Sequence, residues 1–349
     1  MSTPRICLTP KVSGIGGMVS FRHRLAAGLA HRDVQLSDDL ENGHYDAVLV
    51  IGGTRQLPTL WRLRREGARI VQRLNGMNWL HRVRRTGLRH FVRAEYGNWL
   101  LSLIRSRLVD RVVYQSEFAR GWWERTYGPT PVPSRVIYNR VDLAVYTPQG
   151  PGLIPPDRWR ILLVEGRLMG GYEMGLEAAV GLAGHLSQST RIAHSLPGAH
   201  AVELMVVGQV SQETRLRWEL RTAAPIVWVG LQPAELIPEI DRSAHLLYSA
   251  DLNAACPNSV IEALACGLPV LSFDTGALPE LVVGDAGRVV PYGGDPWRLE
   301  QPDIPALAQA ALEILDNQER FRHAARLRAE AAFGLDQMVE NYLQILLEV

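Results

Sequence analysis

Short apolar runs alternate along the whole chain with stretches in which apolar residues recur at helical spacing. This alternation is typical of βαβ units, so it predicts an α/β fold with parallel sheets. The strands predicted in the first half are Arg5–Leu8, Asp46–Ile51, Arg69–Arg73, Arg111–Gln115 and Arg135–Tyr138. Those predicted in the second half are Arg160–Glu165, Glu203–Gly208, Ile226–Gly230, Ala244–Ser249 and Pro269–Phe273.

A segment rich in Pro and Gly interrupts this pattern near the middle of the chain. The 349 residues are enough for two domains of ordinary size, each with its own core. We therefore predict a first Rossmann-like domain over residues 1–148, a linker over 149–157 and a second Rossmann-like domain over 158–334. A last helical stretch follows over residues 335–349.

Composition narrows the class of protein. No apolar run approaches the ~20 residues that cross a bilayer, and the N-terminus lacks the pattern of a signal peptide. The three cysteines (Cys7, Cys256 and Cys266) form neither a disulfide framework nor a metal site, and no His, Cys or carboxylate set has metal-ligand spacing. We expect a cytoplasmic protein without a metal or a cofactor.

Arginines are concentrated in one region of the first half, although the net charge of the chain is only +1. Between Met77 and Leu108 the chain reads as one or two amphipathic helices with arginines among aromatic and aliphatic residues. This pattern predicts peripheral attachment to an anionic membrane surface, on its inner face. An equally weighted alternative is that the arginines bind an acidic acceptor or face solvent while the aromatic residues pack inside. Nucleic acid is disfavoured, because no recognition fold accompanies the charge. The arginines of the Met77–Leu108 region are Arg82, Arg84, Arg85, Arg89, Arg93, Arg105 and Arg107.

The segment from Cys256 to Val270 predicts a loop, a short helix that includes Glu262, a glycine stop and a strand. It resembles the donor-binding signature of family-4 retaining glycosyltransferases, which have the GT-B fold. The continuation through Ser272–Val282 and Gly284–Gly287 is also similar to that family. The resemblance implies two Rossmann-like domains facing each other across a cleft, with the C-terminal helix crossing back to the first domain.

The resemblance also implies how a nucleoside-diphosphate sugar is bound. Glu262 would hold the ribose and Arg167 the diphosphate, while Ser259 is also placed to cap its helix. The loop at residues 13–18 resembles the Gly-Gly loop of the family, although a plain tight turn is the simpler alternative; its G-x-G-x-x-G spacing fails. The backbone amides expected to complete the phosphate site belong to Gly16, Gly17, Gly170, Gly171, Asn258 and Ser259.

Three positions depart from the pattern of the family. Ala254 stands where the first Glu of the signature would contact sugar hydroxyls, and no lysine follows Arg167, since Lys11 is the only lysine of the chain. Arg140 replaces the usual glycine in the segment before the hinge. Nucleotide recognition is therefore expected to be retained, while sugar positioning and stabilisation of the leaving group are open.

The sequence favours a metal-independent, retaining transferase that passes a sugar from a nucleoside-diphosphate sugar to a glycan or lipid-linked acceptor. No side chain is a convincing catalytic base. An alternative is a nucleotide-sugar-binding homologue that has lost activity and acts with a partner. A GT-B epimerase or phosphorylase is less favoured, because no catalytic carboxylate cluster or cofactor lysine is evident.

Overall fold

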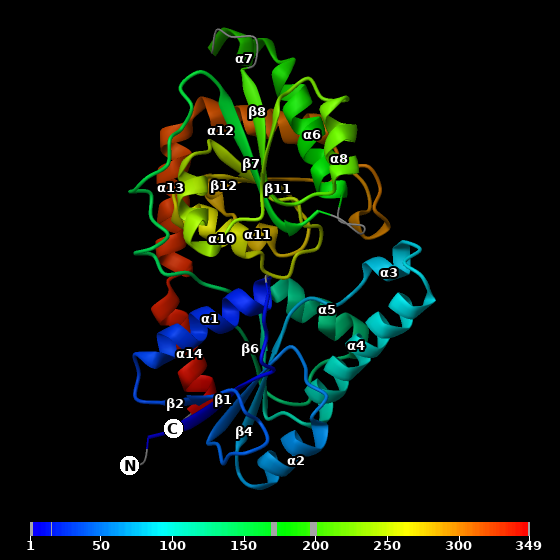
Figure 1. Ribbon diagram of the computed structural model, residues 1–349, viewed down its shortest axis with the longest axis vertical. Helices are drawn as coiled ribbons and strands as arrows, with labels where there is room; N and C mark the ends of the chain where they lie inside the picture. The colour runs from blue at the N-terminus through cyan, green and yellow to red at the C-terminus, as the bar shows by residue number, and fades with distance from the viewer. Residues whose placement is uncertain (1–2, 15, 169–172, 196–200, 348–349) are drawn as a thin grey trace. The chain divides into compact units, whose positions relative to one another are not determined.

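The computed structural model describes residues 3–14, 16–168, 173–195 and 201–347, which form two compact units (Figure 1). Unit 1 comprises Met1–Arg140 and Gly334–Val349, and unit 2 comprises Val141–Phe333. The division falls at Arg140 rather than at residue 148, because the segment after it bonds to unit 2. Arg242 Nε donates to the carbonyl of Pro151 at 2.6 Å, and Arg326 Nη1 donates to that of Tyr146 at 2.8 Å.

Unit 1 contains a six-stranded parallel sheet in the order β2-β1-β3-β4-β5-β6. The apolar run of β3 is buried along its whole length, as expected for a strand covered on both faces. The strands are β1 (Arg5–Thr9), β2 (Gln35–Ser37), β3 (Ala47–Ile51), β4 (Arg69–Leu74), β5 (Arg111–Tyr114) and β6 (Ser134–Val136).

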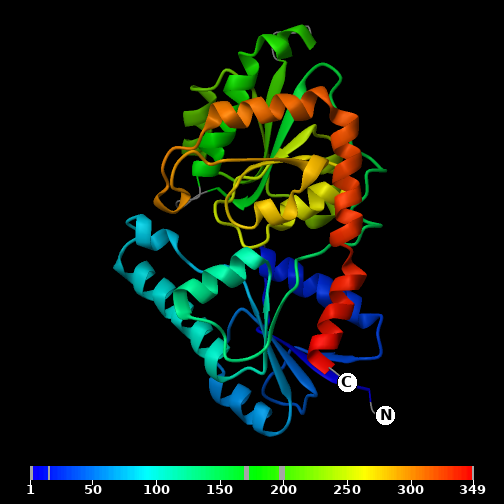
Figure 2. The same cartoon turned by 180° about the vertical axis from the view of Figure 1, so that it is seen from behind.

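Helices cover both faces of this sheet. On one face α1 (Gly17–Ala30) and α14 (Leu335–Leu347) lie side by side, and Phe21 of α1 contacts Tyr342 of α14 with ring centroids 5.3 Å apart (Figure 1). The final helix is therefore part of unit 1. The other face carries α2 (Leu57–Arg65), α4 (Leu88–Arg107) and α5 (Glu117–Tyr127), with the short α3 (Leu80–Val83) before α4 (Figure 2). Ser116 caps α5 as predicted, since its Oγ accepts from the N–H of Ala119 at 3.0 Å.

Unit 2 contains a second six-stranded parallel sheet, in the order β12-β11-β10-β7-β8-β9. Its strands are β7 (Trp159–Arg167), β8 (Val202–Gln209), β9 (Ile226–Gly230), β10 (Leu246–Tyr248), β11 (Val270–Phe273) and β12 (Gly287–Val290). All ten predicted strands are present in the two sheets, with small shifts of their ends. The sequence reading missed β2 and β12, which are short strands at sheet edges.

The helices of unit 2 follow its strands in βαβ order. In the core, α6 packs against α12, and α10 packs against both α9 and α13. The helices are α6 (Met174–Ser187), α7 (Thr190–Ser195), α8 (Gln212–Glu219), α9 (Ile237–Arg242), α10 (Asn258–Ala265), α11 (Leu278–Leu281), α12 (Ile304–Asp316) and α13 (Gln318–Ala332), with single 3-10 turns at Ala234–Leu236, Gly284–Ala286 and Pro296–Arg298.

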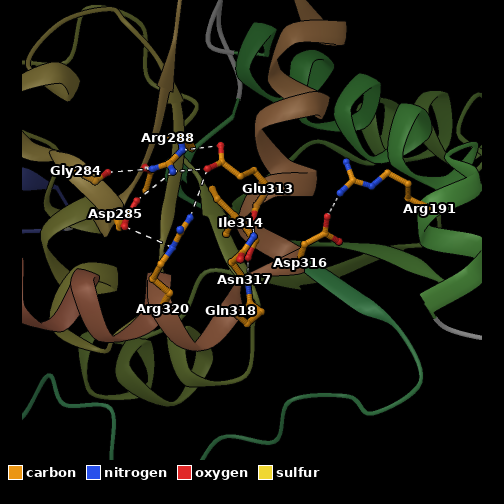
Figure 3. A network of polar contacts seen from close by, with 11 residues as sticks. Arg191, Gly284, Asp285, Arg288, Glu313, Ile314, Asp316, Asn317, Gln318 and Arg320 are labelled. Atoms are coloured by element: carbon orange, nitrogen blue, oxygen red, sulfur yellow. Dashed lines mark hydrogen bonds and ion pairs between the residues drawn. The ribbon is translucent and has the colours of Figure 1, made fainter.

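A network of ion pairs lies at the amino edge of the unit 2 sheet, where β12 begins (Figure 3). Arg288 donates to Glu313 Oε2 at 2.8 Å and to Asp285 Oδ1 at 3.1 Å, and its guanidinium lies 4.4 Å from the ring centroid of Phe321. Arg320 pairs with the same two carboxylates, at 3.4 Å from Asp285 and 3.5 Å from Glu313. At this edge every charge of the network faces an opposite charge.

Candidate functional site

The strand order of each sheet reverses beside its first strand, between β1 and β3 in unit 1 and between β7 and β10 in unit 2. In open α/β sheets, ligands bind at the carboxyl ends of the strands where the order reverses. Each unit therefore has its own candidate site, in the loops that follow these strands.

Helix α10 begins close to the reversal in unit 2, and its first turn has no side-chain cap. Pro257 occupies the N-cap position and Asn258 is the first helical residue. The prediction that Ser259 caps this helix is wrong, because Ser259 lies inside the helix and its hydroxyl cannot reach back to the first amides. Those amide N–H groups therefore remain available to an anion.

Glu262 lies on α10 and is 8% exposed, among residues that are fully buried. Asp241 of α9, 1% exposed, lies close enough for the two carboxylates to interact. Burial raises the pKa of Asp241 well above its ordinary value, and the charge of Glu262 raises it further. Asp241 Oδ2 has no hydrogen-bond partner among the described residues. The predicted ribose ligand thus has an acidic neighbour that the sequence reading missed.

Arg167 is the last residue of β7 and is exposed, with its backbone paired to Gln209 of β8. Within the described part of the chain its side chain forms no hydrogen bond or ion pair, so the guanidinium is available to a phosphate. Gly170 and Gly171, the other predicted amide donors of this loop, lie outside the described residues. Position 167 therefore fits the predicted diphosphate ligand in location and exposure.

Two half-buried carboxyl groups, Glu165 and Asp251, lie at the reversal point itself. Glu165 lies near the carboxyl end of β7, and Asp251 follows β10, which pairs with β7 in parallel. Burial and the neighbouring charge of Asp251 raise the pKa of Glu165 well above its usual range, and burial raises the pKa of Asp251 to about 6. Within the described ranges, no group of three or more His, Cys, Asp or Glu side chains is arranged to hold a metal ion.

The sequence reading missed this pair because the two residues are far apart in the chain.

Ala254, the position of the absent family glutamate, is 5% exposed and its backbone is fixed. Its carbonyl accepts from the N–H of Ala277 at 2.8 Å, and a Cβ on Gly276 would lie 2.5 Å from its N and O atoms. The preceding Asn253 has a φ of 56°, and its buried Nδ2 has no partner among the described residues.

A cavity of about 440 Å³ adjoins this loop. Its lining includes Ala250 and Leu252, which flank Asp251, and Met174 and Gly175 at the start of α6. A Cβ on Gly175 would lie 2.5 Å from Cβ of Ala250, so helix and loop are in close contact. The cavity therefore gives a ligand access to the loop after β10, at the carboxyl edge of the unit 2 sheet.

In unit 1 the predicted glycine loop follows β1, at the reversal of that sheet. Gly16 is the N-cap of α1 with a φ of 142°, Gly17 is the first helical residue, and both are exposed. Gly14 has a φ of 94°, which favours glycine. The loop therefore presents backbone N–H groups at a helix start without a side-chain cap, as an anion site requires.

The Met77–Leu108 region of unit 1 exposes large apolar side chains, among them Phe91 (41%), Trp99 (52%) and Leu88 (79%). Its arginines do not share one environment. Arg105 is buried and donates to the Tyr114 hydroxyl at 2.8 Å, which contradicts its prediction as part of a basic face. The exposed arginines Arg85, Arg89, Arg93 and Arg107 have no side-chain partner among the described residues. None of the described helices is long and apolar enough to span a bilayer.

Residues 181–317 match the family model "Glycosyl transferases group 1". This part of the chain is therefore similar to group 1 glycosyl transferases. The matched stretch includes α10 with Glu262 and the loop with Asp251, so the similarity covers part of the site described above.

Two curated relatives extend the similarity. The chain is 24% identical over 255 residues to alpha-maltose-1-phosphate synthase of Mycolicibacterium smegmatis, covering 68% of this chain and 62% of the relative. It is 27% identical over 128 residues to 2-deoxystreptamine N-acetyl-D-glucosaminyltransferase of Streptomyces fradiae, covering 36% of this chain and 28% of the relative. In both cases the chain spans less than two thirds of the relative's length.

A solved structure matches the whole chain. It is Alr3699/HepE of Anabaena in complex with UDP-glucose, with a TM-score of 0.67, 14% identity, and coverage of 99% of this chain and 100% of that one. The prediction of a two-domain GT-B fold is confirmed. The cleft between the two Rossmann-like units stays a prediction.

Proposed function

We propose that the chain transfers a sugar from a nucleoside-diphosphate sugar to an acceptor, with retention of configuration and without a divalent metal. The observation that carries this proposal is the position of Glu262 and the uncapped first turn of α10. Both lie inside the group 1 glycosyl transferase match, at the carboxyl edge of the unit 2 sheet. The structural neighbour that holds UDP-glucose supports a nucleotide sugar as donor.

The diphosphate is held by positive charge and backbone amides. The Arg167 guanidinium donates hydrogen bonds to phosphate oxygens, and the backbone N–H groups of Asn258 and Ser259 donate to the remaining ones. As the sugar leaves, negative charge grows on the diphosphate, and these fixed donors stabilise it without a metal.

The donor sugar is positioned by Asp251 and Glu165 in place of the glutamate absent at Ala254. Carboxyl groups accept hydrogen bonds from sugar hydroxyls, and a protonated one can also donate. Burial and the charge of Asp251 raise the pKa of Glu165 well above its usual range, so Glu165 is the member of the pair that more readily keeps a proton.

Replacement of Arg167 tests the donor site. Arg167→Ala should weaken UDP binding by roughly 1.5–3 kcal/mol, the scale of charge-assisted hydrogen bonds to phosphate. Arg217→Ala removes an exposed arginine of α8 that pairs with Glu213 and serves as the matched control. Calorimetry that finds the same UDP affinity in both variants would remove Arg167 from the site.

The second candidate is a nucleotide-sugar-binding homologue without turnover that acts with a partner. The buried Ala254 and the absence of any lysine in residues 141–333 favour it. A panel of nucleotide sugars separates the two: tight binding with neither transfer nor hydrolysis supports the inactive homologue, and sugar release supports the transferase.

We also propose that the exposed face of α3 and α4 attaches unit 1 to an anionic membrane, where a lipid-linked acceptor would be found. Exposed arginines beside exposed Phe91, Trp99 and Leu88 combine charge attraction with apolar insertion. In co-sedimentation at low salt, the chain should follow vesicles with anionic lipid and not neutral vesicles. Replacing Arg85, Arg89 and Arg93 with Gln should abolish this difference; equal recovery with both vesicle types refutes the attachment.

A further inference from the structure

A buried arginine lies at the carboxyl edge of the unit 1 sheet, where neither the donor site nor the membrane face uses it. Arg73 is near the end of β4 and is fully buried. Its guanidinium lies 3.7 Å from the ring centroid of Phe21 in α1, and its carbonyl accepts from the N–H of Gly52 at 2.8 Å. Arg73 is paired with Ile51 of β3, so the charge lies on the strand next to the reversal between β1 and β3.

Side-chain amides from the ends of three neighbouring strands surround this charge. Arg73 Nη1 donates to Asn75 Oδ1 and Nη2 donates to Asn139 Oδ1, both at 2.6 Å. The side-chain amide of Gln115 completes the cluster: the same end of it lies against Asn75 Oδ1 and 2.9 Å from both Nη1 and Nη2 of Arg73. These residues follow β4, β6 and β5 respectively, and parallel strands place such positions at one edge.

The arginine fixes the orientation of the Asn75 amide. A guanidinium has only donors, so it holds the amide oxygen toward itself and turns the NH₂ group away. The indole N–H of Trp123 donates to the backbone carbonyl of Asn75 at 2.7 Å and fixes the loop as well. Asn75 is half-buried while Arg73, Gln115 and Asn139 are buried, so Asn75 is the member of the cluster that a ligand can reach.

A donor oriented in this way selects for a particular chemistry. The NH₂ group of Asn75 can only donate, and the buried charge behind it makes negative charge favourable there. An ionised carboxylate or phosphate accepts hydrogen bonds and carries that charge, whereas a neutral sugar hydroxyl gains less from the buried cation.

We propose that Asn75, oriented by Arg73, binds an oxyanion of the acceptor, either a carboxylate or a phosphate. This assignment rests on the proposed function, because it takes unit 1 as the acceptor side of a transferase. It adds a class of acceptor: a sugar or lipid carrier that bears an acidic group close to the hydroxyl that is glycosylated.

The test uses the full chain with inorganic phosphate and glucuronate as probes, glucose as the neutral reference, and constant ionic strength. Affinities are measured by calorimetry with and without saturating UDP. Asn75→Asp keeps an acceptor for Arg73 but replaces the outward NH₂ with an oxygen, so it should weaken binding at least about tenfold. Asn78→Asp adds the same charge at an exposed residue of the same loop that does not contact Arg73, and should change affinity less than about twofold. Asn75→Ala removes the donor without adding charge and should fall between them.

The outcomes separate the sources. Binding of phosphate alone or of glucuronate alone, tighter than glucose and retained with UDP, supports the proposal and identifies the acidic group. Binding that UDP abolishes belongs to the donor diphosphate and overturns the proposal, as does equal loss in Asn75→Asp and Asn78→Asp, or no preference over glucose. If wild-type chain fails to bind UDP, the proposed function fails, and the titrations without UDP still decide the role of Asn75.

Discussion

The carboxyl edges of the two sheets hold different ionisable groups. In unit 1 the edge contains Arg73 among amide side chains and the ring of Phe21, and in unit 2 it contains the carboxyl pair Glu165 and Asp251. The sheets have the same number of strands, all parallel, and the same kind of reversal. In both units the parallel strands place polar side chains at the same edge of the sheet. A few residues then decide whether that edge holds a cation or titratable carboxyl groups, and hence how the stability of the unit depends on pH.

The largest effect expected from this comparison follows the loss of the cation. Arg73→Met leaves the oxygens of Asn75 and Asn139 without their donor in a buried site, which should cost roughly 3–5 kcal/mol of unfolding free energy. Hydrogen exchange measured by mass spectrometry should quicken in β4, β5 and β6 and stay unchanged in β7 and β10.

Arg85→Met is the control for this variant, because Arg85 is exposed and has no side-chain partner among the described residues. It should change stability by less than about 0.5 kcal/mol. Similar exchange rates in the two variants would mean that the amide cluster does not depend on Arg73.

The stability that the carboxyl pair contributes to unit 2 should fall as pH rises, whereas most surface acids contribute stability that falls as pH drops. The pKa of Asp251 rises from an ordinary 3.8 to about 6 in the folded chain, so folding binds a proton in that window. The stability contributed by this group is fully present below pH 3.8, the ordinary pKa, and is lost as pH rises through about 6. Asp251→Asn should therefore stabilise unit 2 by about 1–3 kcal/mol at pH 8 and have little effect at pH 4.

Urea unfolding at both pH values measures this difference. Glu177→Gln, at an exposed residue of α6, is the control and should show no pH-dependent gain. A gain of equal size at pH 4 and pH 8 would show that packing, and not charge, governs position 251.

The smallest effect on stability is expected at the amino edge of the unit 2 sheet, where Arg288 and Arg320 pair with carboxylates. Arg288→Met removes hydrogen bonds to Glu313 and Asp285 but keeps an apolar side chain over Phe321 (Figure 3). Since the network is partly exposed, the loss should be about 1–2 kcal/mol, with UDP affinity unchanged. A loss of UDP binding in calorimetry would show that the amino edge also supports the donor site.

The sequence was sufficient for the strands because parallel strands covered on both faces read as apolar runs, as in β3 and β7. It failed at β2 and β12, since short edge strands bury little and leave a weak pattern. The domain boundary was misplaced because Pro and Gly residues mark a loop, whereas the hydrogen bonds of Arg242 and Arg326 decide to which unit the segment belongs.

The candidate site could be predicted only where one contiguous segment carries it. Glu262 and the start of α10 belong to such a segment. Glu165 and Asp251, or Arg73, Asn75 and Asn139, come together through strand pairing between distant parts of the chain, and no spacing in the sequence marks them. Burial of Asp241 beside Glu262 likewise depends on the packing of α9 against α10.

The return of the chain to unit 1 through α14 makes unit 2 an insertion within unit 1. The N–H of Val141 donates to the carbonyl of Phe333 at 3.0 Å, so the first and last residues of unit 2 are neighbours. Arg140 Nη1 in turn lies 3.5 Å from the carbonyl of Gly334, which brings the two cut ends of unit 1 close together. We therefore expect that a short peptide joining Arg140 to Gly334 restores a continuous unit 1, and that Val141–Phe333 can be expressed as a separate piece.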